Sequence, residues 1–203
     1  LILPPEMIFY NKDFFDKFRE EKKEGILLSY IYPAMINENG INESSGLHNY
    51  LYEGVEENNW WLRDGYGQKI EVWPSIYAVN LNKKDWIDFN ANYIKNKIEI
   101  KEWDGIMYDT VNSTIDNGNG NGAEIDGDGV KDDKDYVNKM WQEGMAELFQ
   151  KTREKTGSEM IILINGDSLD LYQPHINGRM FETFPTPWEG NGKWQASMDQ
   201  YLN

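Results

Sequence analysis

The sequence predicts an α/β fold around a parallel β-sheet, arranged either as a barrel or as a doubly wound sheet. Short apolar runs alternate with amphipathic segments, which is the pattern of strands connected by covering helices. The expected strands are residues 26–35, 104–111, 159–168 and 178–185. With 203 residues, the chain can bury one sizeable core but is short for a complete eight-stranded barrel. We therefore expect a single domain over residues 1–203.

An amphipathic helix and a buried strand are expected near the start of the chain. In segment 13–24, three phenylalanines share one face and charged residues occupy the others, so we expect a helix capped near Asn11 and stopped by Gly25. The run 26–35 is apolar and is ended by Pro33, which is typical of a strand covered on both faces.

Residues 36–75 show little periodicity and are expected to form a long irregular segment. Trp60, Trp61 and Trp73 lie there among Gly and Asn, and long aromatic loops are often functional. The whole chain holds eight Trp and twelve Tyr, and partly exposed rings are suited to stacking on sugars. The alternative is that each ring is a core residue with a polar tip.

The second half of the chain predicts helices between the strands. Segment 83–99 repeats apolar residues at helical spacing, and segment 136–157 carries a longer apolar stripe that Gly157 closes. The stripe consists of Val137, Trp141, Met145 and Leu148. No glycine-rich turn of the dinucleotide or phosphate-binding type follows an expected strand, which disfavours nucleotide binding.

Composition and charge exclude several classes of function. The 35 acidic and 20 basic side chains leave a formal net charge of −15, which repels nucleic acids and anionic membranes, so a neutral or cationic partner is expected. No segment approaches the roughly 18 apolar residues of a membrane span, and we expect no membrane insertion. The lack of cysteine excludes disulfides and thiolate chemistry, and His48 and His175 have no ligand spacing. Nothing in the sequence indicates the oligomeric state.

Six carboxylates fall within residues 124–135, and their spacing predicts a calcium site. In EIDGDGVKDDKD, oxygen-bearing residues alternate and a glycine stands at the sixth position, as in EF-hand loops. The expected ligands are Glu124, Asp126, Asp128, the carbonyl oxygen of Val130, Asp132 and Asp135. Glu at the first position and Asp at the last depart from the usual pattern, so we expect a modest affinity and a structural role for Ca²⁺.

Other interpretations of this loop remain open. It is also consistent with a solvated acidic segment that binds no metal. A second register, through Asn117, Asn119, Asn121, Gly122 and Asp128, has the same spacing with mostly neutral amides. A dockerin-like docking module would need two tandem loops, each with its own helix.

Acidic and amide side chains stand at the ends of three expected strands. They are Asp109, Asn165 with Asp167, and Glu182. In parallel α/β barrels, the carboxyl ends of the strands form the mouth that carries the chemistry. Alternation puts Asp109 on the face of Met107 and Glu182 on the face of Met180, so both carboxylates can point into the mouth.

Two carboxylates in a cleft with many aromatic rings suggest glycoside hydrolysis. One carboxylic acid protonates the leaving oxygen, while the other, ionised, attacks the anomeric carbon or activates water. The alternative is a structural pair that holds loops through backbone amides. Asp104, at the start of its strand, is expected to be structural.

Seven segments, taken in order, resemble the glycoside hydrolases of TIM-barrel type. They are WWLRDGYGQKIEVWP, YAVNLNKKDWIDF, WDGIMYDTV, IDGDGVKDD, WQEGMAELFQKTREKTG, IILINGD and RMFETFP, and they cover the chain from about Gly25 to Pro187. The resemblance implies a (β/α)8 TIM barrel. Because only about four strands are visible, we expect this segment to hold part of the barrel.

The resemblance also implies roles for individual residues. Asp109 becomes the nucleophile and Glu182 the general acid/base. Candidate substrate contacts at matching motif positions are Arg63, Asp64, Asn165 and Trp188, to which we add Trp73 and Asp167. Arg63 and Asp64 are equally consistent with a local salt bridge, and Thr110 stands where the family pattern often has Asn.

The first hypothesis is a secreted or surface glycoside hydrolase of bacterial type that cleaves a poly- or oligosaccharide with retention and is stabilised by calcium. Extracellular fluids supply calcium at concentrations that suit a weak site, which is the reason for the expected location. The second hypothesis is a noncatalytic glycan-binding module that keeps the aromatic cleft.

Overall fold

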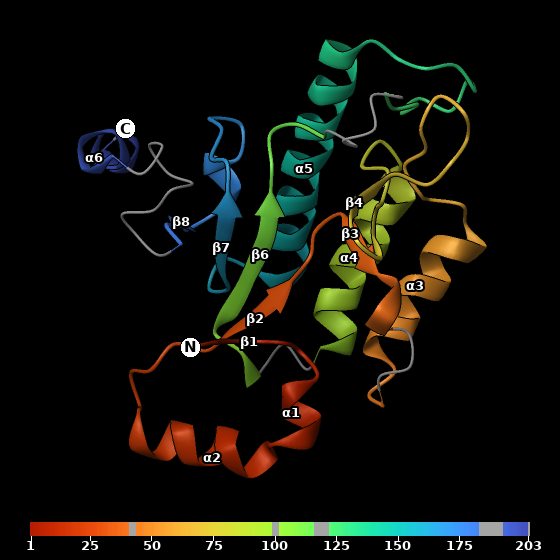
Figure 1. Cartoon of the computed structure of the whole chain (residues 1–203). Coiled ribbons are helices and arrows are strands. Elements are labelled where there is room, and N and C mark those ends of the chain that lie inside the picture. Colours follow the sequence, from red (N-terminus) through yellow and green to blue (C-terminus); the bar gives the residue numbers. More distant parts are fainter. Residues whose placement is uncertain (41–43, 99–101, 116–121, 183–192, 203) are drawn as a thin grey trace.

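A five-stranded parallel β-sheet forms the centre of the protein (Figure 1). The computed structural model describes residues 1–40, 44–98, 102–115, 122–182 and 193–202. The strands, in the order in which they pair, are β1 (Ile2–Leu3), β2 (Leu28–Ile31), β6 (Gly105–Val111), β7 (Ile161–Gly166) and β8 (Gly178–Met180).

The order of the strands distinguishes a barrel from a doubly wound sheet. Every neighbouring pair is parallel, and the order in the sheet is the order along the chain. A doubly wound sheet reverses its strand order at a switch point, whereas a barrel wall does not. The described strands form an open sheet, so the chain is a partial (β/α) barrel.

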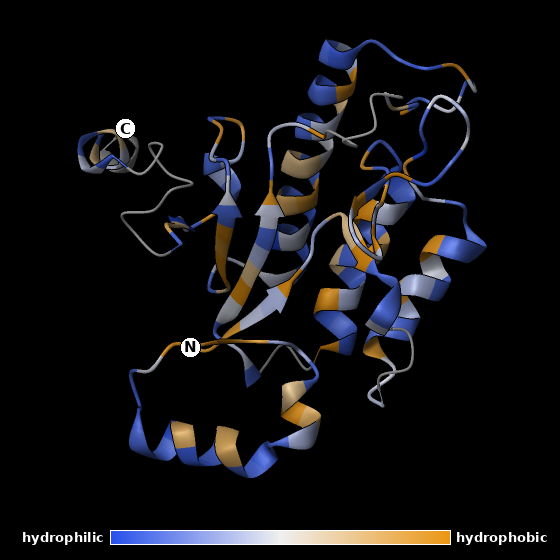
Figure 2. Cartoon of the chain, viewed as in Figure 1, coloured by the Kyte–Doolittle hydropathy of each residue, from blue (hydrophilic) through white to orange (hydrophobic). Residues whose placement is uncertain are grey.

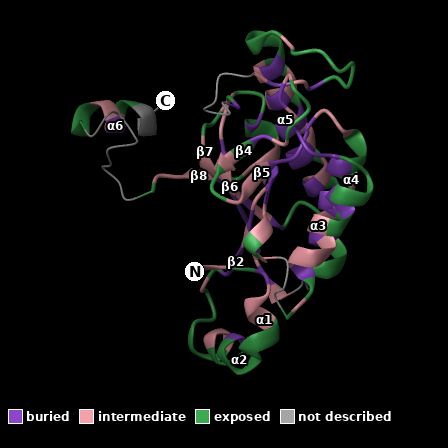
Figure 3. Ribbon diagram, turned by 45° about the vertical axis from the view of Figure 1, so that its right-hand side comes forward, coloured by how far each residue is buried: buried purple, intermediate pink, exposed green. Residues whose placement is uncertain are grey.

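Helices cover one face of this sheet. In Figure 1, α5 (Lys134–Thr156) runs behind β6 and α4 (Lys84–Lys97) lies beyond the tip of β2, and Figure 3 shows buried residues on both helices. Ile106, Tyr108, Ile162 and Ile164 are fully buried on this face. The Tyr108 ring packs against Phe149 of α5, and its hydroxyl lies 2.7 Å from that of Thr152.

The opposite face of the sheet is the inside of the barrel. Along β6, Met107 and Asp109 alternate with the residues that face α5. Along β7, Leu163 and Asn165 are half-buried, whereas their neighbours under α5 are fully buried. An inner face that is only partly covered is what a partial barrel leaves.

A small antiparallel sheet lies beside the barrel wall, in the segment where the sequence predicts irregular structure. It pairs β3 (Met35–Asn37) and β4 (Glu71–Trp73) with the central β5 (Ile76–Ala78). The helix α3 (Leu47–Glu57) packs against α4. The ring of Tyr50 in α3 stacks on the ring of Phe89 in α4, with 4.9 Å between the ring centroids. The prediction of a long irregular segment was therefore wrong. Strands of three residues leave almost no periodic signal, but Leu47, Leu51 and Val55 of α3 are buried at helical spacing, and the prediction missed this pattern.

The strand expected over residues 26–35 is divided between the two sheets. β2 ends at Ile31, and Met35 opens β3, so the expected continuous strand was wrong. Pro33, between the two strands, cannot donate a backbone hydrogen bond to a sheet. β1 was not predicted, since a two-residue strand has no detectable pattern.

The expected helices are confirmed, with shifted ends. α2 (Lys12–Glu21) begins after Asn11 but ends at Glu21, before Gly25. α4 and α5 match segments 83–99 and 136–157 to within two residues, and Gly157 caps α5. Figure 2 shows the apolar residues of α5 beside β6, and the four expected stripe residues are buried.

Short helical elements complete the described structure. They are α1 (Met7–Tyr10), η1 (Glu38–Gly40), η3 (Gln173–His175) and α6 (Trp194–Leu202). β8 covers residues 178–180 of the expected strand 178–185, whose last three residues lie outside the described ranges. Within those ranges, no helix combines the length and the apolar character needed to cross a bilayer.

Candidate active site

The amide of Asn165 joins two carboxylates at the carboxyl edge of the parallel sheet. Its Nδ2 donates to Asp109 Oδ1 at 2.8 Å and to Glu182 Oε2 at 3.3 Å. The three side chains come from β6, from β7 and from the turn after β8. Because both carboxylate oxygens are hydrogen-bonded to one nitrogen, they lie within about 6 Å of each other.

The register of the strands explains this meeting. β6 pairs with β7 so that Met107 stands opposite Leu163, and β7 pairs with β8 so that Asn165 stands opposite Met180. Side chains two residues apart share a face, so Asp109 follows Met107 on the inner face. The structure therefore brings Asp109 and Glu182 together on the inside of the barrel wall.

Tyr30 of β2 contributes a third contact, which the sequence analysis did not predict. Its hydroxyl donates a hydrogen bond to Asp109 Oδ2, and its ring packs edge-on against Tyr32 at 5.2 Å. Burial, together with the hydrogen bond to Asp109, raises the pKa of Tyr30 far above its usual value. The phenol therefore stays protonated and remains a donor to the carboxylate.

The backbone next to Asp109 is strained. Thr110 has φ 59°, in the left-handed region that a β-branched residue rarely adopts, and the β6–β7 register shifts between Tyr108 and Val111. In this conformation the Thr110 N–H lies 2.8 Å from Asp109 Oδ1 and donates to it. The Asp109 carboxylate thus accepts hydrogen bonds from a phenol, an amide side chain and a backbone N–H. Strain of this kind is concentrated at functional sites.

Arg63 and Asp64 stabilise the turn of residues 63–68 through hydrogen bonds. The guanidinium of Arg63 donates to Gly67 O at 2.8 Å and to Asn59 Oδ1 at 2.7 Å. Asp64 is 3% exposed, and its Oδ1 accepts from the backbone N–H groups of residues 66 and 68 at 2.9 Å each. These contacts give both residues a structural part in the loop.

Two further expected substrate contacts, Asp167 and Trp73, lie in different parts of the described structure. Asp167, just after β7, accepts a hydrogen bond from the Ser113 N–H at 2.7 Å and so ties the loop after β6 to the loop after β7. Trp73 is 44% exposed at the end of β4 in the small sheet. Trp188 lies outside the described residues.

Asp104 stands at the opposite edge of the sheet from Asp109. Its Oδ2 accepts from Arg19 at 2.9 Å and from the Leu27 N–H at 2.7 Å. These contacts connect α2 and the start of β2 to the start of β6, as expected of a structural carboxylate.

Three of the six expected metal ligands converge in the acidic loop. One carboxylate oxygen each of Glu124, Asp126 and Asp128 lies within 4.8 Å of the others, so this group could hold a metal ion. Gly127 and Gly129 between and beside them have φ 92° and 82°, the sharp turns that alternate ligands require.

The other expected ligands take part in the surrounding loop. Asp132 Oδ2 accepts from the Ile125 N–H at 2.7 Å, the Val130 N–H donates to Asp128, and Asp135 lies in the first turn of α5. Asp133, which was not predicted, caps that helix by accepting from the N–H groups of residues 135 and 136. The second register is mostly outside the described ranges, since residues 116–121 belong to none of them.

Solved structures with a similar fold include three sugar-related enzymes. They are an α-galactosidase of Geobacillus stearothermophilus in complex with raffinose, a maltogenic α-amylase of Thermotoga neapolitana and a dextranase of Flavobacterium johnsoniae complexed with glucose. Their TM-scores are 0.56, 0.53 and 0.52, at sequence identities of 10%, 13% and 11%. At these identities the likeness shows the fold alone.

The matches cover 85%, 94% and 81% of this chain, but 22%, 37% and 20% of the three enzymes. The chain thus spans well under half the length of the proteins it resembles.

No curated protein matches the chain. A family model does match, over residues 27–203, and this confirms the resemblance to glycoside hydrolases. The chain belongs to the family described as hypothetical glycosyl hydrolase family 15.

Proposed function

We propose that this chain carries the catalytic carboxylate pair of a glycoside hydrolase, with Asp109 as the nucleophile and Glu182 as the general acid/base. The observation that carries the proposal is the Asn165 amide, which contacts both carboxylates from the strand between them. The partial barrel and the family support the same reaction class.

The surroundings of the two carboxylates support this division of roles. Asp109 accepts hydrogen bonds from Tyr30, Asn165 and the Thr110 N–H, all of which stabilise an ionised carboxylate. Glu182 is exposed and accepts one of the described hydrogen bonds, from Asn165. An ionised group is required of the nucleophile, and a group that exchanges protons with solvent is suited to the acid/base role.

The proposed reaction has two steps. In the first, an Asp109 oxygen bonds to the anomeric carbon as the glycosidic C–O bond breaks, and Glu182 gives its proton to the leaving oxygen. In the second, the ionised Glu182 takes a proton from water, the water oxygen bonds to the anomeric carbon, and the bond to Asp109 breaks. A separation of about 5–5.5 Å between the two carboxyl groups is typical of this retaining route, and the contact of one oxygen from each group with Asn165 Nδ2 supports a short separation.

We propose an oligo- or polysaccharide as the substrate. The net charge of −15 favours a partner that is not anionic, and enzymes of similar fold are described in complex with raffinose and with glucose. The chain covers 22% and 20% of the length of those two enzymes, so we propose the activity for the whole protein.

We also propose that Glu124, Asp126 and Asp128 bind a structural Ca²⁺. Three carboxylates held this close repel one another, and a divalent ion offsets that repulsion. The loop leads directly into α5, so an ordered loop would stabilise the start of this 23-residue helix. A weak calcium site suits the calcium concentration outside cells, which supports a secreted or surface location.

Substitution of Glu182 tests the function. The protein is assayed on raffinose, dextran and soluble starch by reducing-end release, together with Glu182→Gln and Asp109→Asn. Loss of a general acid is expected to lower kcat by about 10²- to 10⁴-fold, with substrate binding retained. Glu159→Gln is the matched control, because this exposed glutamate precedes β7 at the opposite edge of the sheet.

The assay also separates an enzyme from the alternative glycan-binding module. A binder would retain sugar binding in every variant and show no turnover in the parent protein. NMR of the first product formed reports whether its anomeric configuration is that of the substrate. An inverted product would contradict the nucleophilic role of Asp109.

A further inference from the structure

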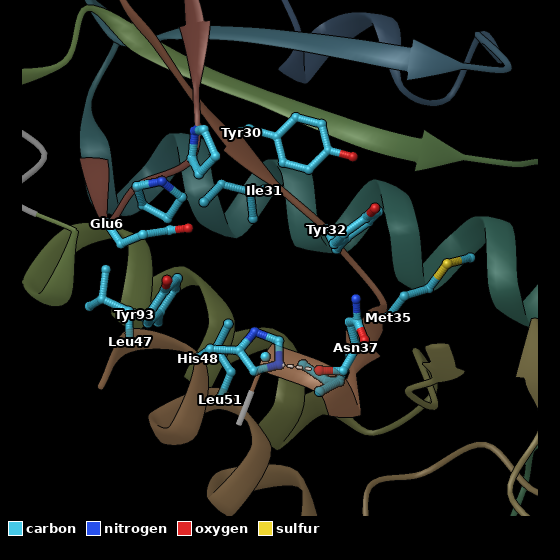
Figure 4. Close-up of a pocket in the computed structure, with 14 residues that line it drawn as sticks. Glu6, Tyr30, Ile31, Tyr32, Met35, Asn37, Leu47, His48, Leu51 and Tyr93 are labelled. Carbon is cyan, nitrogen blue, oxygen red and sulfur yellow. Dashed lines mark hydrogen bonds between the residues drawn. The ribbon is translucent and has the colours of Figure 1, made fainter. Parts of the chain in front are cut away.

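A cavity of about 260 Å³ lies beside β2, between the end of β1 and the helices α3 and α4 (Figure 4). Residues 4–6, directly after β1, and residues 32–37, directly after β2, contribute to its walls. Both segments follow the carboxyl ends of parallel strands, the edge of the sheet toward which Asp109 and Glu182 also lie. The cavity therefore lies on the same edge of the sheet as the carboxylates, at the mouth of the partial barrel.

Two residues connect the cavity to Asp109. Tyr30 lines the cavity, and its hydroxyl donates a hydrogen bond to the Asp109 carboxylate. Met35 also lines the cavity, and its Sδ accepts a hydrogen bond from Thr110 Oγ1 at 3.5 Å. A molecule in the cavity would thus contact side chains that themselves contact the nucleophile and its neighbour.

The lining combines apolar and polar groups in the way that ligand sites do. Ile31, Leu47 and Leu51 supply an apolar wall, and Tyr30 and Tyr32 supply aromatic rings. The polar lining residues include Glu6, His48 and Asn37. The imidazole Nε2–H of His48 donates a hydrogen bond to the backbone carbonyl of Asn37. Figure 4 shows Glu6 extending from the end of β1 toward the cavity, with His48 across from it.

The charge of the lining limits the ligands that fit. Glu6 is half-buried, and the described lining contains neither lysine nor arginine. A carboxylate can accept hydrogen bonds from sugar hydroxyls, but it repels a second carboxylate or a sulfate in the same space. The apolar wall and the rings suit the C–H face of a pyranose.

We propose that this cavity is a sugar-binding subsite that accepts an uncharged pyranose unit and rejects uronic acids. This inference rests on the proposed function, because it assigns the cavity to the saccharide that the carboxylate pair cleaves. It adds a specificity for neutral sugars, with Glu6 as the residue that enforces the rejection.

The test measures binding, so that it does not depend on turnover. The protein is labelled with [¹³C-methyl]methionine, the Met35 signal is assigned with Met35→Leu, and D-galactose, D-glucose, D-galacturonate and D-glucuronate are titrated separately. The two neutral sugars are expected to shift the Met35 signal at concentrations at least about tenfold lower than the two uronates, because one contact with a charged group changes the affinity by about that factor. Met145, fully buried in α5, serves as the internal reference.

Glu6→Gln removes the charge and keeps the shape of the side chain. In this variant, the affinity for the uronates is expected to approach the affinity for the neutral sugars. Glu53→Gln, at an exposed position on α3, should leave the difference in affinity unchanged. Equal shifts with uronates and neutral sugars in the parent protein, or no Met35 shift with any sugar, would overturn the proposal. Asp109→Asn separates the two proposals: it should abolish hydrolysis and leave the Met35 titration intact. Hydrolysis without a Met35 shift would retain the enzyme and reject the subsite.

Discussion

The side-chain amide of Asn165 lies 2.8 Å from the carboxylate of Asp109, on the neighbouring strand of the barrel wall. Since the same nitrogen also contacts Glu182, Asn165 keeps two like charges apart while holding both in place. An amide can do this because it donates two hydrogens and carries no charge of its own.

Asn165→Ala is expected to lower kcat by about 10- to 100-fold, because both carboxylates lose a donor that orients them. Asn165→Asp should be more damaging, since it places a third carboxylate between the other two. Initial rates over a range of substrate concentrations measure the effect. Gln150→Ala, which removes an exposed amide from α5, is the control and should behave like the parent. Parent-like kcat in Asn165→Ala would show that the contact is not needed for turnover.

Tyr30→Phe is expected to reduce kcat by about tenfold with little change in KM, because the ring stays and only the donor to Asp109 is lost. Initial rates fitted at several substrate concentrations give kcat and KM separately.

Tyr172→Phe is the matched control for this substitution. The Tyr172 hydroxyl is buried in the core, where it has no hydrogen-bond partner among the described contacts, so its removal should leave kcat and KM unchanged. A parent-like kcat in Tyr30→Phe, or an equal loss in Tyr172→Phe, would contradict the role of Tyr30.

Thr110→Asn is expected to stabilise the protein. Asn tolerates positive φ far better than a β-branched residue does, so the strain at φ 59° should fall by about 1 kcal/mol. Such a gain raises Tm by about 2–4 °C for a domain of this size. Calorimetry measures it, and Thr114→Asn, at an exposed position outside any strand, is the control. A lower Tm in Thr110→Asn would mean that the hydroxyl contacts to Asp109 O and Met35 outweigh the backbone strain.

Calcium is expected to raise Tm in the parent protein, and Asp128→Asn should remove most of that increase because the three-carboxylate group loses a charge. Asp133→Asn lies in the same loop but caps α5, and Asn is itself a good cap, so its response to calcium should match that of the parent. Thermal melts with calcium and with chelator measure both variants. An identical calcium response in Asp128→Asn and the parent would argue for a solvated loop that binds no metal.

The features that depend on local periodicity could be predicted from the order of the amino acids alone. Alternation along residues 104–111 put Asp109 on the face opposite the helix, and the stripe of residues 137–148 predicted the buried side of α5. Both patterns reflect the fixed geometry of a strand or a helix, in which side-chain direction follows from position along the chain. The alternating acids of residues 124–128 belong to the same class, because neighbouring residues can converge without help from distant ones.

Which distant residues meet depends on how the elements pack together. Tyr30 reaches Asp109 because β2 pairs with β6, although the two residues are 79 positions apart in the chain. The sequence also marked Arg63 and Asp64 as strongly as Asn165, yet the first two close a turn while the third joins the carboxylates. Strand order and register set these outcomes, and they follow from the packing of the whole core, which no local pattern records.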